Sequence, residues 1–84
     1  MSKADKVLSD MRRNPRGDWR VQDLTRIADR FGIPWRQPGT SHVTFAPENS
    51  QNVTVPAHKP IKPVYVRQFL AMIDSVRRSG REEG

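Results

Sequence analysis

The side chains best suited to acid–base chemistry in this sequence are its two histidines, His42 and His58. Histidine is the residue whose ordinary pKa is close to neutral, so general acid or base work is assigned to one of these two. Ser41 directly precedes His42. Neighbours in a strand point to opposite faces, however, which disfavours a Ser–His–acid triad. We therefore expect proton transfer by a histidine without a serine nucleophile.

The sequence lacks the residues that metal, thiol and cofactor chemistry need. It contains no cysteine, and its two histidines have no nearby pair of carboxylates to complete a three- or four-ligand metal site. A phosphate-binding Walker loop is also missing, and Gly39 is interpreted as a turn glycine. We expect no metal and no cofactor. The absence of cysteine is compatible with a reducing, cytoplasmic location.

The charge balance indicates the class of partner. The 84 residues include 15 Lys and Arg against 9 Asp and Glu, a formal net charge of +6. This excess favours a polyanion, most simply nucleic acid, although an ordinary solvated basic surface would give the same total. The longest apolar run, Phe69 to Ile73, is far shorter than the roughly 20 residues that span a bilayer. Residues 1–5 lack the apolar segment of a signal peptide, so we expect one small cytoplasmic domain with no membrane partner.

Apolar residues at helical spacing predict two helices in the first third of the chain. The first covers residues 2–13 and ends before the breaker at 14–17. Asp18 is expected to cap the second helix and Gly32 to stop it. The apolar stripe of this second helix consists of Val21, Leu24, Ile27, Ala28 and Phe31.

The middle of the chain has the period of a sheet. Residues 33–37, 41–46 and 52–55 predict three antiparallel strands, the first confined to an edge by Pro34 and followed by a turn at Gly39. Alternation divides the side chains between two faces. We expect Val43, Phe45, Val53 and Val55 in the core, and His42, Thr44 and Thr54 on the opposite face.

The last predicted element is a helix that begins near Pro63 and stops at Gly80. Its apolar stripe holds Val66, Phe69, Leu70, Ile73 and Val76. We therefore expect an α+β fold: a three-stranded antiparallel sheet with helices on one face, plus an extra N-terminal helix, the other sheet face being open.

An exposed His42 between Thr44 and Thr54 suits RNA cleavage. RNA carries its own nucleophile, the 2′-hydroxyl, so a metal-free ribonuclease needs only to move protons and to stabilise the added phosphate charge. The alternative interpretation is a surface or hydrogen-bonded structural histidine.

Three segments in this order resemble the HicA toxin family of bacterial toxin–antitoxin systems. They are Gly39-Thr40-Ser41-His42-Val43-Thr44-Phe45, then Val53-Thr54-Val55-Pro56-Ala57-His58, then Ile61-Lys62-Pro63 opening a helix with Arg67. The resemblance covers about residues 21–76. It implies a fold similar to double-stranded-RNA-binding domains, with the order α-β-β-β-α. It also implies an endoribonuclease that cleaves mRNA and is inhibited by a HicB-type antitoxin. A homo-oligomer and a hetero-oligomer with the antitoxin are both compatible with the sequence.

The resemblance also implies roles for single residues. The catalytic histidine falls on His42, and the later histidine, the lysine before the helix and the helical arginine fall on His58, Lys62 and Arg67. Lys59, Lys62 and Arg67 are expected to bind phosphates. His58, Thr44 and Thr54 complete the expected RNA-binding set. The departures from the family pattern are the short segment 58–63, which bears on substrate contacts, and residues 1–20, which precede the usual start.

These features divide the chain into a helical extension over 1–20, a HicA-like domain over 21–78 and a loose tail over 79–84. Two other functions are compatible with the sequence. One is a non-catalytic RNA- or DNA-binding module that uses the same basic surface. The other is a protein-interaction fragment, for which Trp19, Trp35 and Tyr65 are candidate anchors, although core packing is the simpler role for the two tryptophans.

Overall fold

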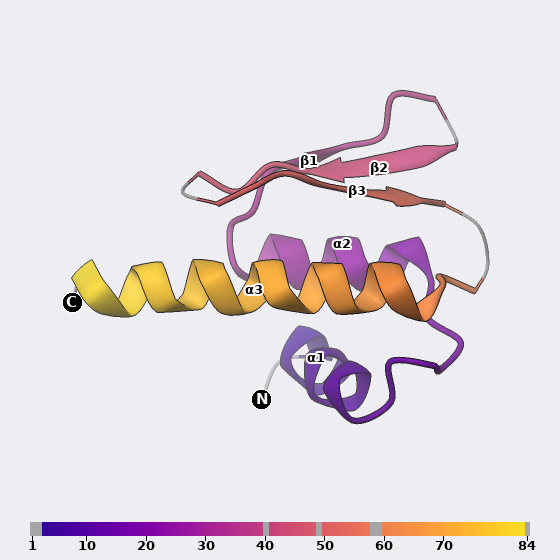
Figure 1. Cartoon of the computed structure of the whole chain (residues 1–84), viewed down its shortest axis with the longest axis horizontal. Helices are drawn as coiled ribbons and strands as arrows, with labels where there is room; N and C mark the ends of the chain where they lie inside the picture. The colour runs from indigo at the N-terminus through magenta and orange to yellow at the C-terminus, as the bar shows by residue number, and fades with distance from the viewer. Residues whose placement is uncertain (1–2, 40, 49, 58–59, 84) are drawn as a thin grey trace.

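The chain begins with two helices, α1 (Lys3–Arg13) and α2 (Val21–Arg30), as the sequence predicts (Figure 1). A computed structural model describes the backbone of residues 3–39, 41–48, 50–57 and 60–83, and side chains as far as Arg78. Each of the two helices buries one apolar stripe, so both are stabilised by packing rather than by length. The buried residues are Ala4, Leu8 and Met11 in α1, and Leu24, Ile27 and Ala28 in α2.

The start of α2 differs from the expectation that Asp18 caps it. The carboxylate of Asp23 accepts a hydrogen bond from the backbone N–H of Arg20 at 2.9 Å, and Asp18 instead lies 3.8 Å from the Arg20 guanidinium. An N-cap must directly precede the first helical residue. Because the helix begins at Val21, Asp18 is too early in the chain to cap it, and that prediction is wrong.

The end of α2 is fixed by Gly32, as predicted. Gly32 has a φ of +69°. Its N–H donates to the Asp29 carbonyl at 3.2 Å, and the N–H of Ile33 donates to the Ala28 carbonyl at 2.9 Å. This pair of bonds is a Schellman motif, which satisfies carbonyls that the helix end leaves free.

Gly32→Ala is expected to lower the free energy of unfolding by about 1 kcal/mol, because a Cβ disfavours the left-handed conformation. A Cβ at this position would have no atom within 4 Å, so strain is the only penalty. Gly32→Asn should lower the free energy of unfolding by less, because asparagine tolerates positive φ. Urea unfolding of the three proteins checks this. An Ala variant as stable as the parent would contradict the assignment.

Three strands follow: β1 (Trp35–Arg36), β2 (His42–Phe45) and β3 (Val53–Pro56). They form an antiparallel sheet in the order β1-β2-β3, which confirms the predicted three-stranded antiparallel sheet. β1 and β2 are shorter than predicted, and β3 has the predicted length but begins one residue later. β1 is an edge strand, as expected from Pro34, whose carbonyl accepts a hydrogen bond from the Ala46 N–H at 2.9 Å. The predicted glycine turn before β2 has the expected positive φ, +87°.

The last helix, α3 (Pro63–Glu83), begins at the predicted proline and runs past the predicted end. Gly80 lies within the helical backbone, so the expectation that it stops the helix is wrong. Glycine stops a helix when it adopts the left-handed conformation, whereas inside a helix it costs only about 1 kcal/mol relative to alanine. Most of the segment predicted as a tail, 79–84, is therefore helical in its backbone, as far as Glu83.

The elements are arranged in layers (Figure 1). Helices α2 and α3 cover one face of the sheet, and α1 lies on their far side. The radius of gyration, 12.1 Å, is close to the value of about 12 Å expected for one folded domain of this length. The architecture is the expected α+β fold, with two N-terminal helices, a three-stranded antiparallel sheet and a C-terminal helix. Among the described residues, no helix is both long enough and apolar enough to cross a membrane.

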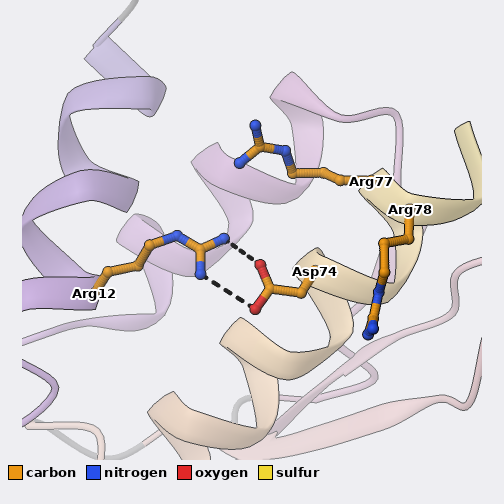
Figure 2. A pocket seen from close by; sticks show the side chains of 4 residues that line it. All are labelled: Arg12, Asp74, Arg77 and Arg78. Atoms are coloured by element: carbon orange, nitrogen blue, oxygen red, sulfur yellow. Dashed lines mark hydrogen bonds and ion pairs between the residues drawn. The ribbon is translucent and has the colours of Figure 1, made fainter. Parts of the chain in front are cut away.

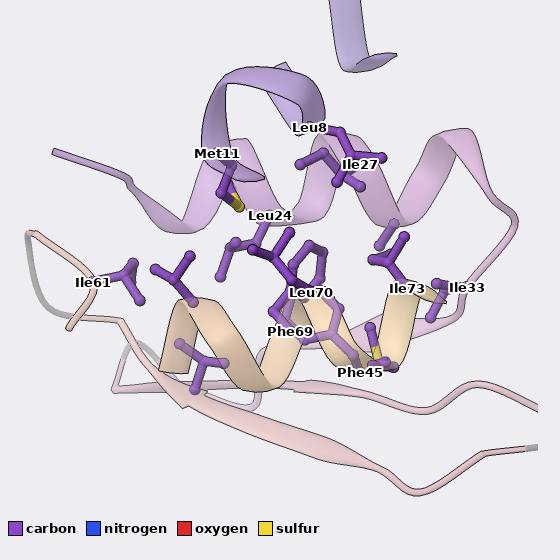
Figure 3. Packing of buried hydrophobic residues seen from close by; sticks show 14 of the residues in the cluster. Leu8, Met11, Leu24, Ile27, Ile33, Phe45, Ile61, Phe69, Leu70 and Ile73 are labelled. Atoms are coloured by element: carbon purple, nitrogen blue, oxygen red, sulfur yellow. The ribbon is translucent and has the colours of Figure 1, made fainter. Parts of the chain in front are cut away.

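The core lies between the sheet and the helices (Figure 3). The rings of Phe45 in β2 and Phe69 in α3 meet edge to face, with centroids 5.0 Å apart. Helix α1 extends this core through Leu8 and Met11, so the N-terminal extension is part of the same hydrophobic cluster. The largest fully buried side chains are Phe45, Phe69, Met11, Leu24, Ile27, Ile73, Val43, Val55 and Val66.

Candidate nucleic-acid interface

We call the sheet face away from the helices the open face. It carries the polar residues of β2 and β3. Side chains alternate between the two faces of a strand, and directly paired residues share a face. Val43, Phe45 and Val55 are fully buried on the helix side. His42, Thr44 and Thr54 therefore lie on the open face, as the sequence predicts, and the His42 side chain is exposed.

Thr44 and Thr54 form the polar centre of the open face. They are paired across β2 and β3, and their hydroxyl oxygens lie 3.1 Å apart in a hydrogen bond. A hydroxyl has one donor and two acceptor positions, so each threonine keeps hydrogen-bonding capacity after this contact. The pair can therefore still bind a phosphate oxygen or a sugar hydroxyl.

Arg36 in β1 belongs to the same face and was not predicted as a site residue. It is paired with Thr44, so Arg36, Thr44 and Thr54 form one row across the sheet. Its neighbour Trp35 is on the other side of the strand, and the Trp35 indole N–H donates to Asp29 of α2 at 2.8 Å. The alternation of side chains along the predicted strand 33–37 could have placed Arg36 on this face. Arg36 adds an exposed cation to the open face.

His42 is paired with Pro56, one row away from Arg36 and the threonines. Diagonal neighbours of this kind have Cα atoms about 7–8 Å apart, within reach of an arginine side chain. None of the described residues forms a hydrogen bond or an ion pair with the His42 imidazole in this structure. The ring can therefore be reached by a ligand from solvent.

The other predicted site residues lie in different places. Lys62 is exposed just before α3 and lines a cavity of about 430 Å³ that Pro56 also lines, so it is at the His42 end of the sheet. Arg67 is exposed on α3, seven residues before Asp74 and hence on the same side of that helix. Asp74 pairs with α1, so Arg67 is directed away from the open face. His58 and Lys59 lie outside the described residues.

A second basic cluster, defined by Arg12, Arg77 and Arg78, lies around Asp74 between α1 and α3 (Figure 2). The Arg12 guanidinium binds both carboxylate oxygens of Asp74, at 2.6 and 3.3 Å. Figure 2 shows the guanidinium groups of Arg77 and Arg78 apart from that carboxylate, which among the residues drawn is joined to Arg12 alone. The Arg77 guanidinium lies 5.7 Å from the centroid of the Phe31 ring, a cation–π contact. These contacts join α1 to α3 and to the end of α2, so the cluster has a structural role.

Within the described part of the chain, no group of three or more His, Cys, Asp or Glu side chains is placed to hold a metal ion. Every buried side-chain nitrogen or oxygen described there also has a hydrogen-bond partner. Among the described residues, the open face carries the His42 imidazole, the Arg36 guanidinium and the paired hydroxyls of Thr44 and Thr54.

Comparison of the chain with models of protein families, with curated proteins and with solved structures finds no match.

Proposed function

We propose that this protein is a metal-independent endoribonuclease that cleaves mRNA, with His42 as general acid or base. The observation that carries the proposal is the exposed imidazole on a sheet face that also holds Arg36 and the Thr44–Thr54 pair. The net charge of +6 supports a polyanionic substrate.

The chemistry requires few protein groups. The 2′-hydroxyl oxygen of RNA attacks the adjacent phosphorus, and the bond from phosphorus to the 5′-oxygen breaks. The 2′-hydroxyl loses a proton and the 5′-oxygen gains one, and His42 transfers one of these two protons. Arg36 stabilises the negative charge that develops on the phosphoryl oxygens. The threonine hydroxyls hold the strand beside the imidazole.

The resemblance to the HicA family supports the same assignment. The Ser-His motif, the Val-x-Val-Pro strand and the Lys-Pro helix start occur in the family's order, and the structure has the α-β-β-β-α order within residues 21–83. On this basis the proposed setting is a cytoplasmic toxin restrained by a HicB-type antitoxin protein.

Purified protein incubated with single-stranded RNA in EDTA tests the proposal. We expect cleavage to products with a 2′,3′-cyclic phosphate and a 5′-hydroxyl, because the 2′-hydroxyl is the nucleophile. RNA with 2′-O-methyl groups should bind and remain intact. Binding without product formation would favour the non-catalytic module, and products with a 3′-hydroxyl would exclude this mechanism.

Arg36→Gln is expected to weaken RNA binding and its dependence on salt. For single strands, each neutralised phosphate contributes about 0.7 to the slope of log affinity against log salt. We expect the slope of the Arg36 variant to be shallower by about 0.7. The affinities are measured by fluorescence anisotropy with 2′-O-methyl RNA. Arg26→Gln is the matched control, because Arg26 is exposed on α2, on the covered side of the sheet. Equal slopes for the two variants would place Arg36 outside the interface.

A further inference from the structure

A cavity at the end of β3 is lined by apolar residues and two cations. Its volume is about 430 Å³, within the range of small-ligand pockets. It lies between the end of β3, the start of α3 and the segment that joins α1 to α2. Its lining residues are Arg16, Gly17, Pro56, Pro60, Ile61, Lys62, Pro63 and Tyr65.

Several contacts hold the walls of this cavity in place. The backbone N–H of Ile61 donates to the Trp19 carbonyl at 2.8 Å, which ties the segment before α3 to the segment before α2. Ile61 is only 2% exposed. The Tyr65 N–H donates to the Lys62 carbonyl at 3.0 Å in the first turn of α3. The three prolines in the lining each have a fixed φ, which limits the backbone movement of these walls.

One residue, Pro56, connects the cavity to His42. Pro56 lines the cavity and is the cross-strand partner of His42, so the two side chains share one face of the sheet. Directly paired residues have Cβ atoms about 4.5–5.5 Å apart. A chain bound at His42 can therefore place its next unit in the cavity.

We propose that this cavity binds one nucleobase of the RNA strand next to the cleaved bond, with the neighbouring phosphate on Arg16 and Lys62. The inference depends on the proposed ribonuclease function. A nucleotide matches the lining, because its flat base stacks on an aromatic ring and packs on prolines, while its phosphate needs cations. Arg16 and Lys62 are both exposed at the cavity, where they can meet a phosphate.

The test uses the full-length protein and small probes. The four nucleoside 5′-monophosphates and ribose 5-phosphate are titrated against the protein, and backbone amide shifts are recorded by NMR. We expect the shifts to centre on Gly17, Ile61 and Tyr65, and at least one nucleotide to bind about tenfold more tightly than ribose 5-phosphate, because base stacking is lost in the latter. Equal affinities, or shifts centred elsewhere, would overturn the proposal.

Variants separate the base contact from the phosphate contact. Lys62→Gln should weaken every phosphate-bearing probe, and Arg26→Gln should weaken none. Tyr65→Leu should reduce the preference for nucleotides over ribose 5-phosphate, whereas Tyr65→Phe, which keeps the ring, should preserve it. Because the probe comparison itself needs no substitution, it remains decisive if the Leu variant unfolds.

The same experiment separates this inference from the ribonuclease proposal. Nucleotide binding in the cavity without any RNA cleavage would support the cavity assignment and remove the catalytic one. RNA cleavage by a protein that shows no preference for nucleotides over ribose 5-phosphate would support the ribonuclease proposal and remove the cavity assignment.

Discussion

His42→Ala is expected to slow RNA cleavage by about 10²- to 10⁴-fold, the range for loss of a positioned general acid or base. The fold should survive, because His42 is exposed and none of the described residues hydrogen-bonds its ring. The measurement is the single-turnover rate in EDTA at saturating protein, with thermal unfolding recorded on the same samples.

Gln22→Ala provides the matched control for this substitution. Gln22 is exposed on α2, which lies on the covered side of the sheet, so its replacement should leave both the cleavage rate and the unfolding temperature unchanged. His42→Gln, which keeps a polar side chain without the proton transfer, should be as slow as His42→Ala. A Gln variant with full activity would remove acid–base chemistry from this residue.

Phe69→Ala is expected to lower the free energy of unfolding by about 3–5 kcal/mol, the usual effect of removing a buried phenylalanine. Phe69 is fully buried, and its ring meets Phe45 across the interface between α3 and the sheet. Small domains have a total stability of about 5–15 kcal/mol, so much of the stability would be lost. Urea unfolding of both proteins at several temperatures measures this loss in the free energy of unfolding.

The control for the core substitution is Val64→Ala on the same helix. Val64 is 51% exposed, so its replacement should change the free energy of unfolding by no more than about 0.5 kcal/mol. A similar small change in Phe69→Ala would mean that α3 does not pack on the sheet through this ring.

The faces of the sheet could be predicted from the sequence because the side-chain period of a strand is two. Once Val43 and Val55 are assigned to the core, His42 and Thr54 must face the other way. The positive φ of Gly32 was equally predictable, since an amphipathic stripe ends there. These features depend only on local pattern.

Other features depend on how the elements meet. The pairing of Arg36 with Thr44 is set by the register between β1 and β2, which residue types alone do not fix. The direction of Arg67 follows from the rotation of α3 about its axis, which is tied to α1 through Arg12 and Asp74. The cavity at Pro56 combines three separate segments, so no local pattern could reveal it.

The most direct test of His42 as the proton-transferring group is to measure RNA cleavage by His42→Ala as imidazole is added. Since His42 is exposed, free imidazole can reach the space that the substitution leaves. We expect almost no cleavage without imidazole, a rate that rises with its concentration, and no such rise for the unaltered protein. Cleavage by His42→Ala at the unaltered protein's rate, independent of imidazole, would contradict a catalytic role for this residue.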